Sequence, residues 1–145
     1  MSNRLYKGIA IAILAAACLL GADRKVIRPA GSSPNAPFSP AILVNGTLYV
    51  SGQVGRDPKT NDYPKEFEAE VRQTLDNIGV IMKEAGYGFQ DVVAVQVYLT
   101  DMEMFQRMNS VYTTYFKEPR PARTTVGVAK LVGPARIEIT VTAQK

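Results

Sequence analysis

The run Val-Val-Ala-Val-Gln-Val-Tyr-Leu, within residues 91–100, constrains the fold more than any other part of this sequence. It is rich in β-branched residues, which favour strands, and it is apolar on both faces for much of its length. Such a strand belongs in the interior of a sheet, where other layers cover both of its faces. We therefore expect helices on one side of this strand and a different covering on the other.

Two amphipathic helices are predicted, one on each side of this strand along the chain. In residues 64–85, apolar side chains recur at three- and four-residue spacing and form one stripe. The stripe consists of Phe67, Val71, Leu75, Ile78, Met82 and Ala85. Pro64 suits the first turn of this helix, and Gly86 suits its C-terminal cap. Asp101 is placed to cap a second helix, which ends before Pro119.

Short strand-forming runs make up most of the remaining chain. Residues 23–30 and 40–52 are expected to be extended, with a turn at Asn45-Gly46, and two further strands are expected at 122–131 and 135–143. This order predicts an α+β fold, a mixed β-sheet with two helices on one face. The second face carries small and semi-polar side chains. Two arrangements fit that face: packing against other subunits, or exposure to solvent.

Residues 1–22 are predicted to be an export leader ahead of a single domain at residues 23–145. Two basic residues precede an apolar stretch, and small residues then precede a charged segment. This is the order of parts in a secretory signal peptide. Cleavage near Ala22 gives a periplasmic or secreted protein with no membrane attachment. Lipidation at Cys18, or retention of the leader, gives a membrane-anchored lipoprotein or anchored protein instead, and both alternatives stay open.

The composition excludes several kinds of chemistry. The sequence has no histidine, and its single cysteine is Cys18 in the leader. Histidine-based triads, thiol nucleophiles, disulfides and His- or Cys-ligated metal sites are therefore excluded from the domain. The net charge of +4 includes two positive charges from the leader, and the other basic residues form no Lys/Arg run. Nucleic acid is therefore not an expected partner.

Arg123 and Glu138 are the candidate catalytic residues. Arg123 lies where a strand begins, after Pro121, and a guanidinium presents paired donors that match a carboxylate. Glu138 lies on the polar face of the last strand, where a carboxylate can activate water. If residues 122–128 and 136–141 form an antiparallel hairpin, the two side chains approach one another at one end. The plainer interpretation makes Arg123 a surface ion-pair residue and Glu138 a solvated carboxylate.

Ser51, Gly52 and Phe38 are further candidates for a binding pocket. Ser51 offers a hydroxyl, and Gly52 lets a ligand approach the backbone closely. Ser51 has no histidine or nearby lysine to activate it, so we expect it to donate a hydrogen bond rather than act as a nucleophile. Phe38, like Tyr49, Tyr112 and Tyr115, is either part of a pocket wall or part of the core.

Several segments, taken together, resemble the reactive-intermediate deaminase (RidA/YjgF) family. They follow one another in register from about residue 25 to residue 143, which is nearly the whole domain. The matching segments are Ser51-Gly52-Gln53, Gln73–Asn77, Val97–Asp101 with Phe105 and Asn109, Pro121–Val126, and Ile137–Ile139.

The resemblance implies a chorismate-mutase-like fold and a homotrimer with ligand clefts between its subunits. It also implies hydrolysis of 2-imino acids, such as 2-iminopropanoate and 2-iminobutanoate, to 2-keto acids and ammonia, with no metal or organic cofactor. The family's carboxylate-binding arginine corresponds to Arg123, and its water-handling glutamate corresponds to Glu138. Its pocket serine, glycine and asparagine correspond to Ser51, Gly52 and Asn109.

Two positions depart from the family pattern. The family's pocket tyrosine corresponds to Phe38, which keeps the ring and lacks the hydroxyl, and its pocket cysteine corresponds to Thr125. The backbone N–H of Thr125 can still meet a substrate carboxylate. Two alternatives to the deaminase are an exported trimer that binds small carboxylates in the same cleft without turnover, and an RNA-directed or chaperone-like activity.

Overall fold

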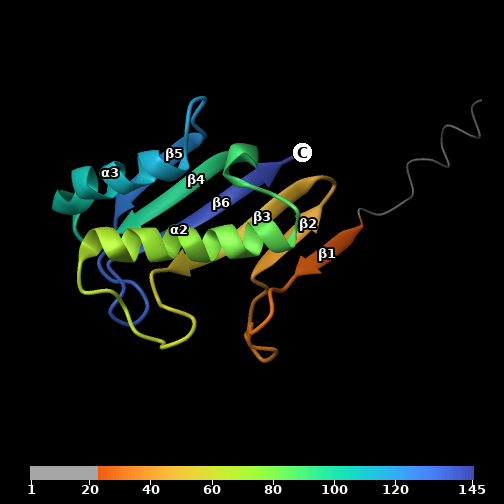
Figure 1. Ribbon diagram of the computed structural model, residues 1–145, viewed down its shortest axis with the longest axis horizontal. Coiled ribbons are helices and arrows are strands. Elements are labelled where there is room, and N and C mark those ends of the chain that lie inside the picture. Colours follow the sequence, from red (N-terminus) through yellow and green to blue (C-terminus); the bar gives the residue numbers. More distant parts are fainter. Residues whose placement is uncertain (1–22) are drawn as a thin grey trace, which may run out of the picture.

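A six-stranded mixed sheet forms the centre of the molecule (Figure 1). The structure, a computed structural model, describes residues 23–145. The strands are β1 (Arg24–Ile27), β2 (Ala41–Val44), β3 (Thr47–Val54), β4 (Val92–Leu99), β5 (Ala122–Gly127) and β6 (Ile137–Gln144). They lie side by side in the order β1-β2-β3-β6-β4-β5. β4 is therefore an interior strand, as its sequence predicts.

The turn between β2 and β3 has the geometry that its sequence predicts. Asn45 and Gly46 both have positive φ, 49° and 73°. Positive φ at both central residues defines the type I′ turn, which Asn-Gly favours and which matches the twist of a hairpin. The turn sets the register in which Val44 pairs with Thr47.

The helix α2 (Phe67–Glu84) packs its apolar stripe against the sheet. Gly86, with φ 79°, ends the helix. The amide of Gly86 donates to the carbonyl of Lys83, and the amide of Tyr87 donates to that of Met82. These are the two hydrogen bonds of a Schellman motif, so the predicted C-terminal cap is confirmed.

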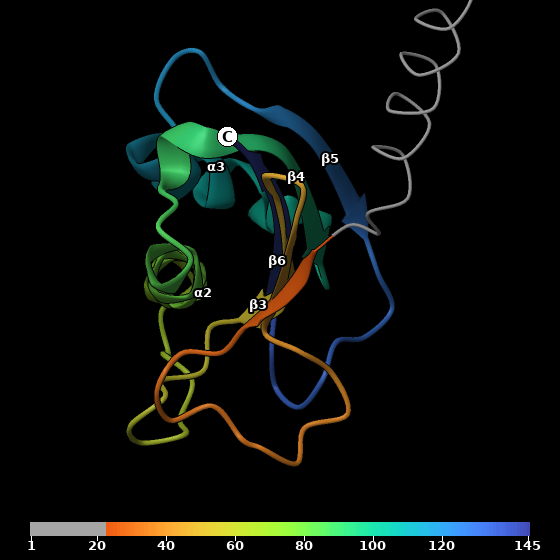
Figure 2. The ribbon, with the colours of Figure 1, turned by 90° about the vertical axis from the view of Figure 1, so that its right-hand side faces the viewer.

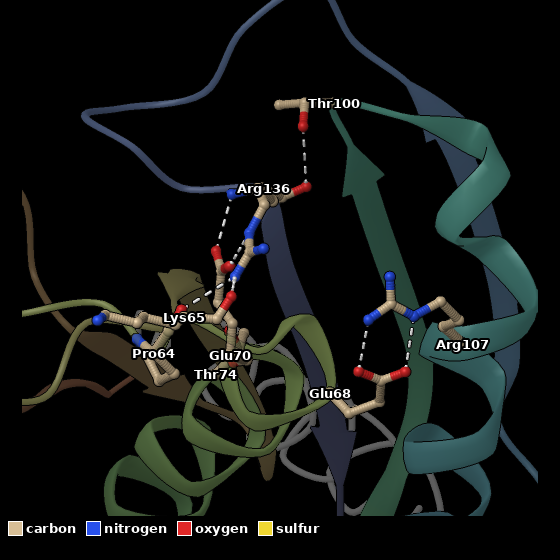
Figure 3. A network of polar contacts seen from close by, with 8 residues as sticks. All are labelled: Pro64, Lys65, Glu68, Glu70, Thr74, Thr100, Arg107 and Arg136. Carbon is tan, nitrogen blue, oxygen red and sulfur yellow. Dashed lines mark hydrogen bonds and ion pairs between the residues drawn. The ribbon is translucent and has the colours of Figure 1, made fainter.

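A polar network explains why α2 begins at Phe67 and not, as predicted, at Pro64 (Figure 3). The carbonyls of Pro64 and Lys65 accept hydrogen bonds from the Arg136 guanidinium at 2.9 and 3.0 Å. In a helix these carbonyls would bond to amides one turn further on. The fully buried Glu70 carboxylate holds Arg136 there, because it accepts from the Arg136 amide at 2.7 Å and from its Nε at 2.5 Å.

The second helix begins at the predicted cap. The carboxylate of Asp101 accepts a hydrogen bond from the Glu103 amide at 2.9 Å. It thereby starts the short 3-10 helix η3 (Met102–Met104), which continues into α3 (Phe105–Tyr115). α3 ends ahead of Pro119, as expected. The first turn is thus a 3-10 turn rather than part of the α-helix.

Both helices lie on one face of the sheet (Figure 2). Along β4 the side chains alternate between the two faces, so Val95, Val97 and Leu99 are buried beneath the helices. Gln96 and Tyr98 point to the opposite side. The predicted fold class, a mixed sheet with two helices on one face, is confirmed.

The opposite side of the sheet, here called the outer face, is partly exposed within one chain. Val26, Tyr49 and Val126 lie on it and are 44%, 50% and 40% exposed. Thr140 and Thr142, which follow one another on the same face of β6, are half-buried. An exposed face that mixes apolar and small polar side chains in this way suits an interface between subunits.

β5 and β6 do not form the predicted hairpin between residues 122–128 and 136–141. β5 pairs in parallel with one edge of β4, and β6 pairs antiparallel with the other edge. The physical reason is the connection, because α3 lies between β4 and β5 and a helical crossover is what parallel strands require. β5 also ends at Gly127 rather than near residue 131.

The predicted leader, residues 1–22, lies outside the described residues. Cleavage near Ala22 and lipidation at Cys18 therefore stay predictions. None of the helices between residues 23 and 145 combines the length and the apolar character needed to cross a membrane.

Candidate active site

Arg123 lies at the edge of the sheet, near the start of β5. It pairs with the buried Val95, and its side chain therefore points to the helix side of the sheet. The guanidinium carbon lies 4.5 Å from the ring centroid of Tyr112 and 5.5 Å from that of Phe105, both on α3. These cation–π contacts hold the guanidinium in place, and they leave its N–H donors available to a ligand.

No carboxylate of the described chain neutralises Arg123. Four side-chain ion pairs form within residues 23–145, and their basic members are Arg107, Arg120, Arg136 and Lys145. Arg123 is half-buried and takes part in none of them. A partly buried charge needs compensation, and a bound carboxylate offers a guanidinium bidentate hydrogen bonds. The side chain of Arg123 is therefore suited to bind an anionic group.

A cavity of about 380 Å³ lies against Arg123, between α3 and the segment that leads into β5. Its lining residues are Asn109, Tyr112, Thr113, Arg120, Pro121 and Arg123. The structure thus brings together two of the predicted site residues, Arg123 and Asn109. A cavity of this size can hold a small carboxylic acid.

Two buried hydroxyls beside Arg123, those of Tyr112 and Thr125, have no hydrogen-bond partner among residues 23–145. Thr125 lies two residues after Arg123 on the same face of β5. Burial raises the pKa of the Tyr112 hydroxyl, and the positive charges of Arg123 and Arg120 oppose that rise. Buried polar groups without a partner are rare, so this region offers hydrogen-bonding groups to a polar ligand.

Glu138 lies on the outer face of the sheet. It pairs with Tyr98 on β4 and with Val54 on β3, while its neighbours along β6 point into the core. Its carboxylate occupies the space beside Gly52, where a Cβ atom would overlap it. Two predicted site residues, Glu138 and Gly52, are thus in direct contact. The register between β3 and β6 shifts at this point, next to Gly52.

Ser51 and Phe38 belong to the same neighbourhood as Gly52. The Ser51 hydroxyl donates to the Ser39 carbonyl at 2.7 Å, and the Ser51 amide donates to the Pro40 carbonyl at 3.0 Å. Ser51 is therefore a hydrogen-bond donor, as expected, but its partner here is the backbone. The bonds hold the segment that carries Phe38 beside β3, and the Phe38 side chain is 55% exposed. Phe38 is thus not part of the core.

The predicted site residues form two groups on opposite faces of the sheet. Arg123, Asn109 and Thr125 lie on the helix side, whereas the group around Glu138 and Gly52 lies on the outer face. Along β4, Arg123 is level with residue 95 and Glu138 with residue 98, a separation of about 10 Å at the usual rise per residue. The predicted approach of Arg123 to Glu138 does not occur within one chain.

Sequence reasoning did not assign Thr113, Arg120 and Pro121 to the site, and it left Tyr112 open between core and pocket wall. Tyr112 follows Asn109 by three residues on a helix, so the two share a face, and this spacing was a usable signal. Arg120 lies three residues before Arg123, but nothing in the spacing indicates that both line one cavity.

Comparison with known families assigns the chain to one of them. Residues 30–145 match the family model described as endoribonuclease L-PSP, which covers most of the chain. The chain belongs to this family, RidA/YjgF. The resemblance in the sequence is thereby confirmed.

Two relatives illustrate the similarity of this RidA-family chain to known proteins. A RutC family protein from Sulfurisphaera tokodaii is 50% identical over 113 residues, which cover 77% of this chain and 90% of the relative. The 2-iminobutanoate/2-iminopropanoate deaminase of Rattus norvegicus is 42% identical over 120 residues, covering 79% and 88%.

Solved structures extend the RidA-family match to the fold. RidA from an Antarctic Psychrobacter superposes with a TM-score of 0.79 at 34% identity, and the match covers 83% of this chain and 99% of that one. The YjgF gene product of E. coli gives a TM-score of 0.76 at 32% identity, with 83% and 98% covered. The described domain therefore has the RidA fold over its whole length.

Proposed function

We propose that this protein hydrolyses 2-imino acids to 2-keto acids and ammonia, with Arg123 binding the substrate carboxylate. Family membership and the deaminase names of the rat and bovine relatives, 42% and 43% identical, support a function of this type. The observation that carries the proposal is Arg123 itself. It is a half-buried guanidinium that is stacked on two rings, has no anionic partner within residues 23–145, and lies at the wall of a cavity sized for a small acid.

Glu138 is the proposed base that accepts a proton from water, and we propose that it comes from a neighbouring copy of the chain. Within one chain it lies on the opposite face from Arg123, so a single chain cannot present both groups to one ligand. Arg123 is on an edge strand, and Glu138 is on the partly exposed outer face. In the homotrimer that the family implies, an edge of one chain packed on the outer face of the next brings the two groups to a shared cleft.

The reaction needs only orientation and proton transfer. The oxygen of a water molecule bonds to the imine carbon as Glu138 accepts a proton from that water. Glu138 then gives that proton to the nitrogen, which leaves a tetrahedral carbon bearing a hydroxyl and an amino group. As the C–N bond breaks, the proton of the hydroxyl also passes to the nitrogen, so ammonia leaves with both protons of the water and the carbon keeps the oxygen as a ketone. An imine carbon is already electrophilic, so a held carboxylate and one positioned water can suffice.

The test is turnover of imines made in situ by an amino-acid oxidase with catalase present, with semicarbazide competing for the imine. We expect the protein to lower semicarbazone formation by diverting the imine to the keto acid. Arg123→Ala should lower kcat/KM by roughly 100-fold, the loss expected for a bidentate charge-assisted pair. Arg72→Ala removes the same charge from the exposed side of α2 and serves as the matched control.

Two results would contradict the mechanism. One is turnover by Arg123→Ala at the rate of the unmodified protein. The other is ligand-dependent thermal stabilisation that is lost in Arg123→Ala while no imine is hydrolysed, which identifies a carboxylate-binding protein without turnover.

Export to the periplasm or medium is a separate proposal. It is supported by the order of charged, apolar and small residues in positions 1–22. The mass of the protein from a native preparation tests it. Cleavage near Ala22, a lipid on Cys18 and an intact N-terminus give three different masses, and the last of these contradicts processing.

A further inference from the structure

The described residues that line the cavity beside Arg123 include two guanidiniums and no carboxylate. The second guanidinium is that of Arg120, and the other lining residues are uncharged. A single carboxylate on the ligand would satisfy Arg123 and leave the charge of Arg120 at the wall of the cavity. The lining therefore carries more positive charge than the proposed monocarboxylate substrates need.

Arg120 is free to exchange its present partner for a ligand. It pairs with Glu118, and the side chains of the two residues are 47% and 71% exposed. Ion pairs this exposed contribute little to stability, since water screens the charges and both side chains lose freedom. On a ligand whose first carboxylate is already bound to Arg123, a second anionic group meets Arg120 as an intramolecular partner and can compete with Glu118.

Arg120 and Arg123 act on the same space. Both positive charges act on the buried Tyr112 hydroxyl. Burial raises the pKa of this hydroxyl, and the charges of Arg123 and Arg120 oppose that rise. Three residues of extended chain separate the α-carbons by at most about 10 Å, a span that the two long side chains can close over a small ligand. Pro121, which lies between them and lines the cavity, has a fixed φ and limits the relative motion of the two side chains.

We propose that Arg120 binds a second anionic group, so that the preferred substrates are 2-imino dicarboxylic acids, the imines of acidic amino acids. This inference rests on the proposed deaminase function. Arg123 holds the carboxylate next to the C=N carbon, and Arg120 holds the side-chain carboxylate. The imines arise when an acidic amino acid loses two electrons and two protons across its Cα–N bond to an oxidant, and this protein then hydrolyses the C=N bond.

The experiment compares kcat/KM for imines of glutamate and aspartate with kcat/KM for the imine of alanine, each made by a suitable oxidase. In the unmodified protein the dicarboxylates should be favoured. Arg120→Ala should lower the dicarboxylate-to-monocarboxylate ratio by about tenfold, the worth of one charge-assisted contact. Arg120→Lys should retain part of the preference, and Arg72→Ala should leave the ratio unchanged.

Binding of the stable products gives an independent measurement. Calorimetry with 2-oxoglutarate and pyruvate should give a Kd ratio that Arg120→Ala changes in the same direction. If alanine-derived imine is hydrolysed and Arg120→Ala leaves both ratios unchanged, the inference fails and the deaminase proposal stands. If none of the imines is hydrolysed, the deaminase proposal itself fails. A ratio that changes equally in Arg72→Ala reflects net charge alone and also overturns the role of Arg120.

Discussion

The space beside Gly52 is filled by a side chain from another strand, the carboxylate of Glu138. Gly52 has no unusual backbone requirement, because it is absent from the residues with positive φ. Its role is therefore steric. A residue with a side chain at position 52 would displace the Glu138 carboxylate, which is the proposed base that accepts a proton from water.

We predict that Gly52→Ala lowers kcat of the deaminase by tenfold or more, since displacing a general base typically costs about 10²–10⁴-fold. Imine hydrolysis measures the effect, and a thermal melt checks that the variant is folded. Glu138→Gln, which fits the same space without a basic group, should show a comparable loss. An active Gly52→Ala variant would mean that the carboxylate is not needed where it now lies.

The chemistry of the site residues could be predicted from the sequence, but the face of the sheet on which each side chain lies could not. Arg123 follows from the match between guanidinium and carboxylate, and Glu138 from the polar side of an alternating strand. Which face each side chain takes depends on strand order, and β4 separates β5 from β6. Arg120 precedes the strand, so periodicity gives no information about its direction.

At the scale of the elements, α2 and α3 are joined by an ion pair. The Arg107 side chain donates to both carboxylate oxygens of Glu68 at 2.7 Å (Figure 3). The hydrogen bond from Arg107 lowers the pKa of Glu68 to about 2 from its usual 4.5. A carboxylate whose pKa is lowered by folding stabilises the folded state. This stabilisation is fully present at pH values above the pKa of the unfolded state, and it is lost as the pH falls through the pKa of the folded state.

We predict that in the native protein Glu68 is still ionised at pH 4 and takes up its proton only around pH 2. Arg107→Ala should return the pKa of Glu68 towards 4.5, because the hydrogen bond that lowers it is gone. Carbon-detected NMR titration of the Glu68 carboxyl group measures both values. A Glu68 pKa that does not respond to Arg107→Ala would assign the lowering to the helix backbone instead.

Glu70 ties three elements together, because Arg136 connects its carboxylate to the turn before α2 and to the start of β6. We predict that Glu70→Ala lowers the free energy of unfolding by about 3 kcal/mol, since it leaves Arg136 without its buried partner. Urea denaturation measures the change. Glu70→Gln keeps hydrogen-bond acceptance and should cost less; equal stability of all three proteins would show that the pair contributes nothing.

Local sequence patterns predicted the helices, strands and turns well, whereas contacts between residues distant in the sequence were harder to predict. The Asn45-Gly46 turn and the Gly86 cap follow from backbone conformations that few residues adopt. The start of α2 could not be predicted, because Arg136, 72 residues beyond Pro64, takes the carbonyls that a longer helix would use. The parallel pairing of β5 with β4 could have been predicted, because the helix α3 connects the two strands.

At the scale of the whole molecule, the proposed site needs two chains. We predict that Arg123→Ala and Glu138→Gln, each nearly inactive alone, restore one another when they are co-expressed with different tags and purified as mixed trimers. If subunits mix at random in equal amounts, about a quarter of the shared sites in all trimers are intact. Activity of the doubly tagged fraction, compared with either variant alone, measures the restoration. Mixed trimers without activity would place both groups within one chain's own site, or in none.

Because Arg123 and Glu138 lie on opposite faces of the sheet, the proposed activity should depend on the concentration of the protein. A catalyst divided between copies is switched off by dilution, because every dissociation event separates the cation from the base. Specific activity should therefore decline below the concentration at which the assembly comes apart, while each chain keeps its fold. If the site is shared between subunits as proposed, turnover depends on the local concentration of the protein without any effector, and the outer face of the sheet contributes to the chemistry as much as the cavity does.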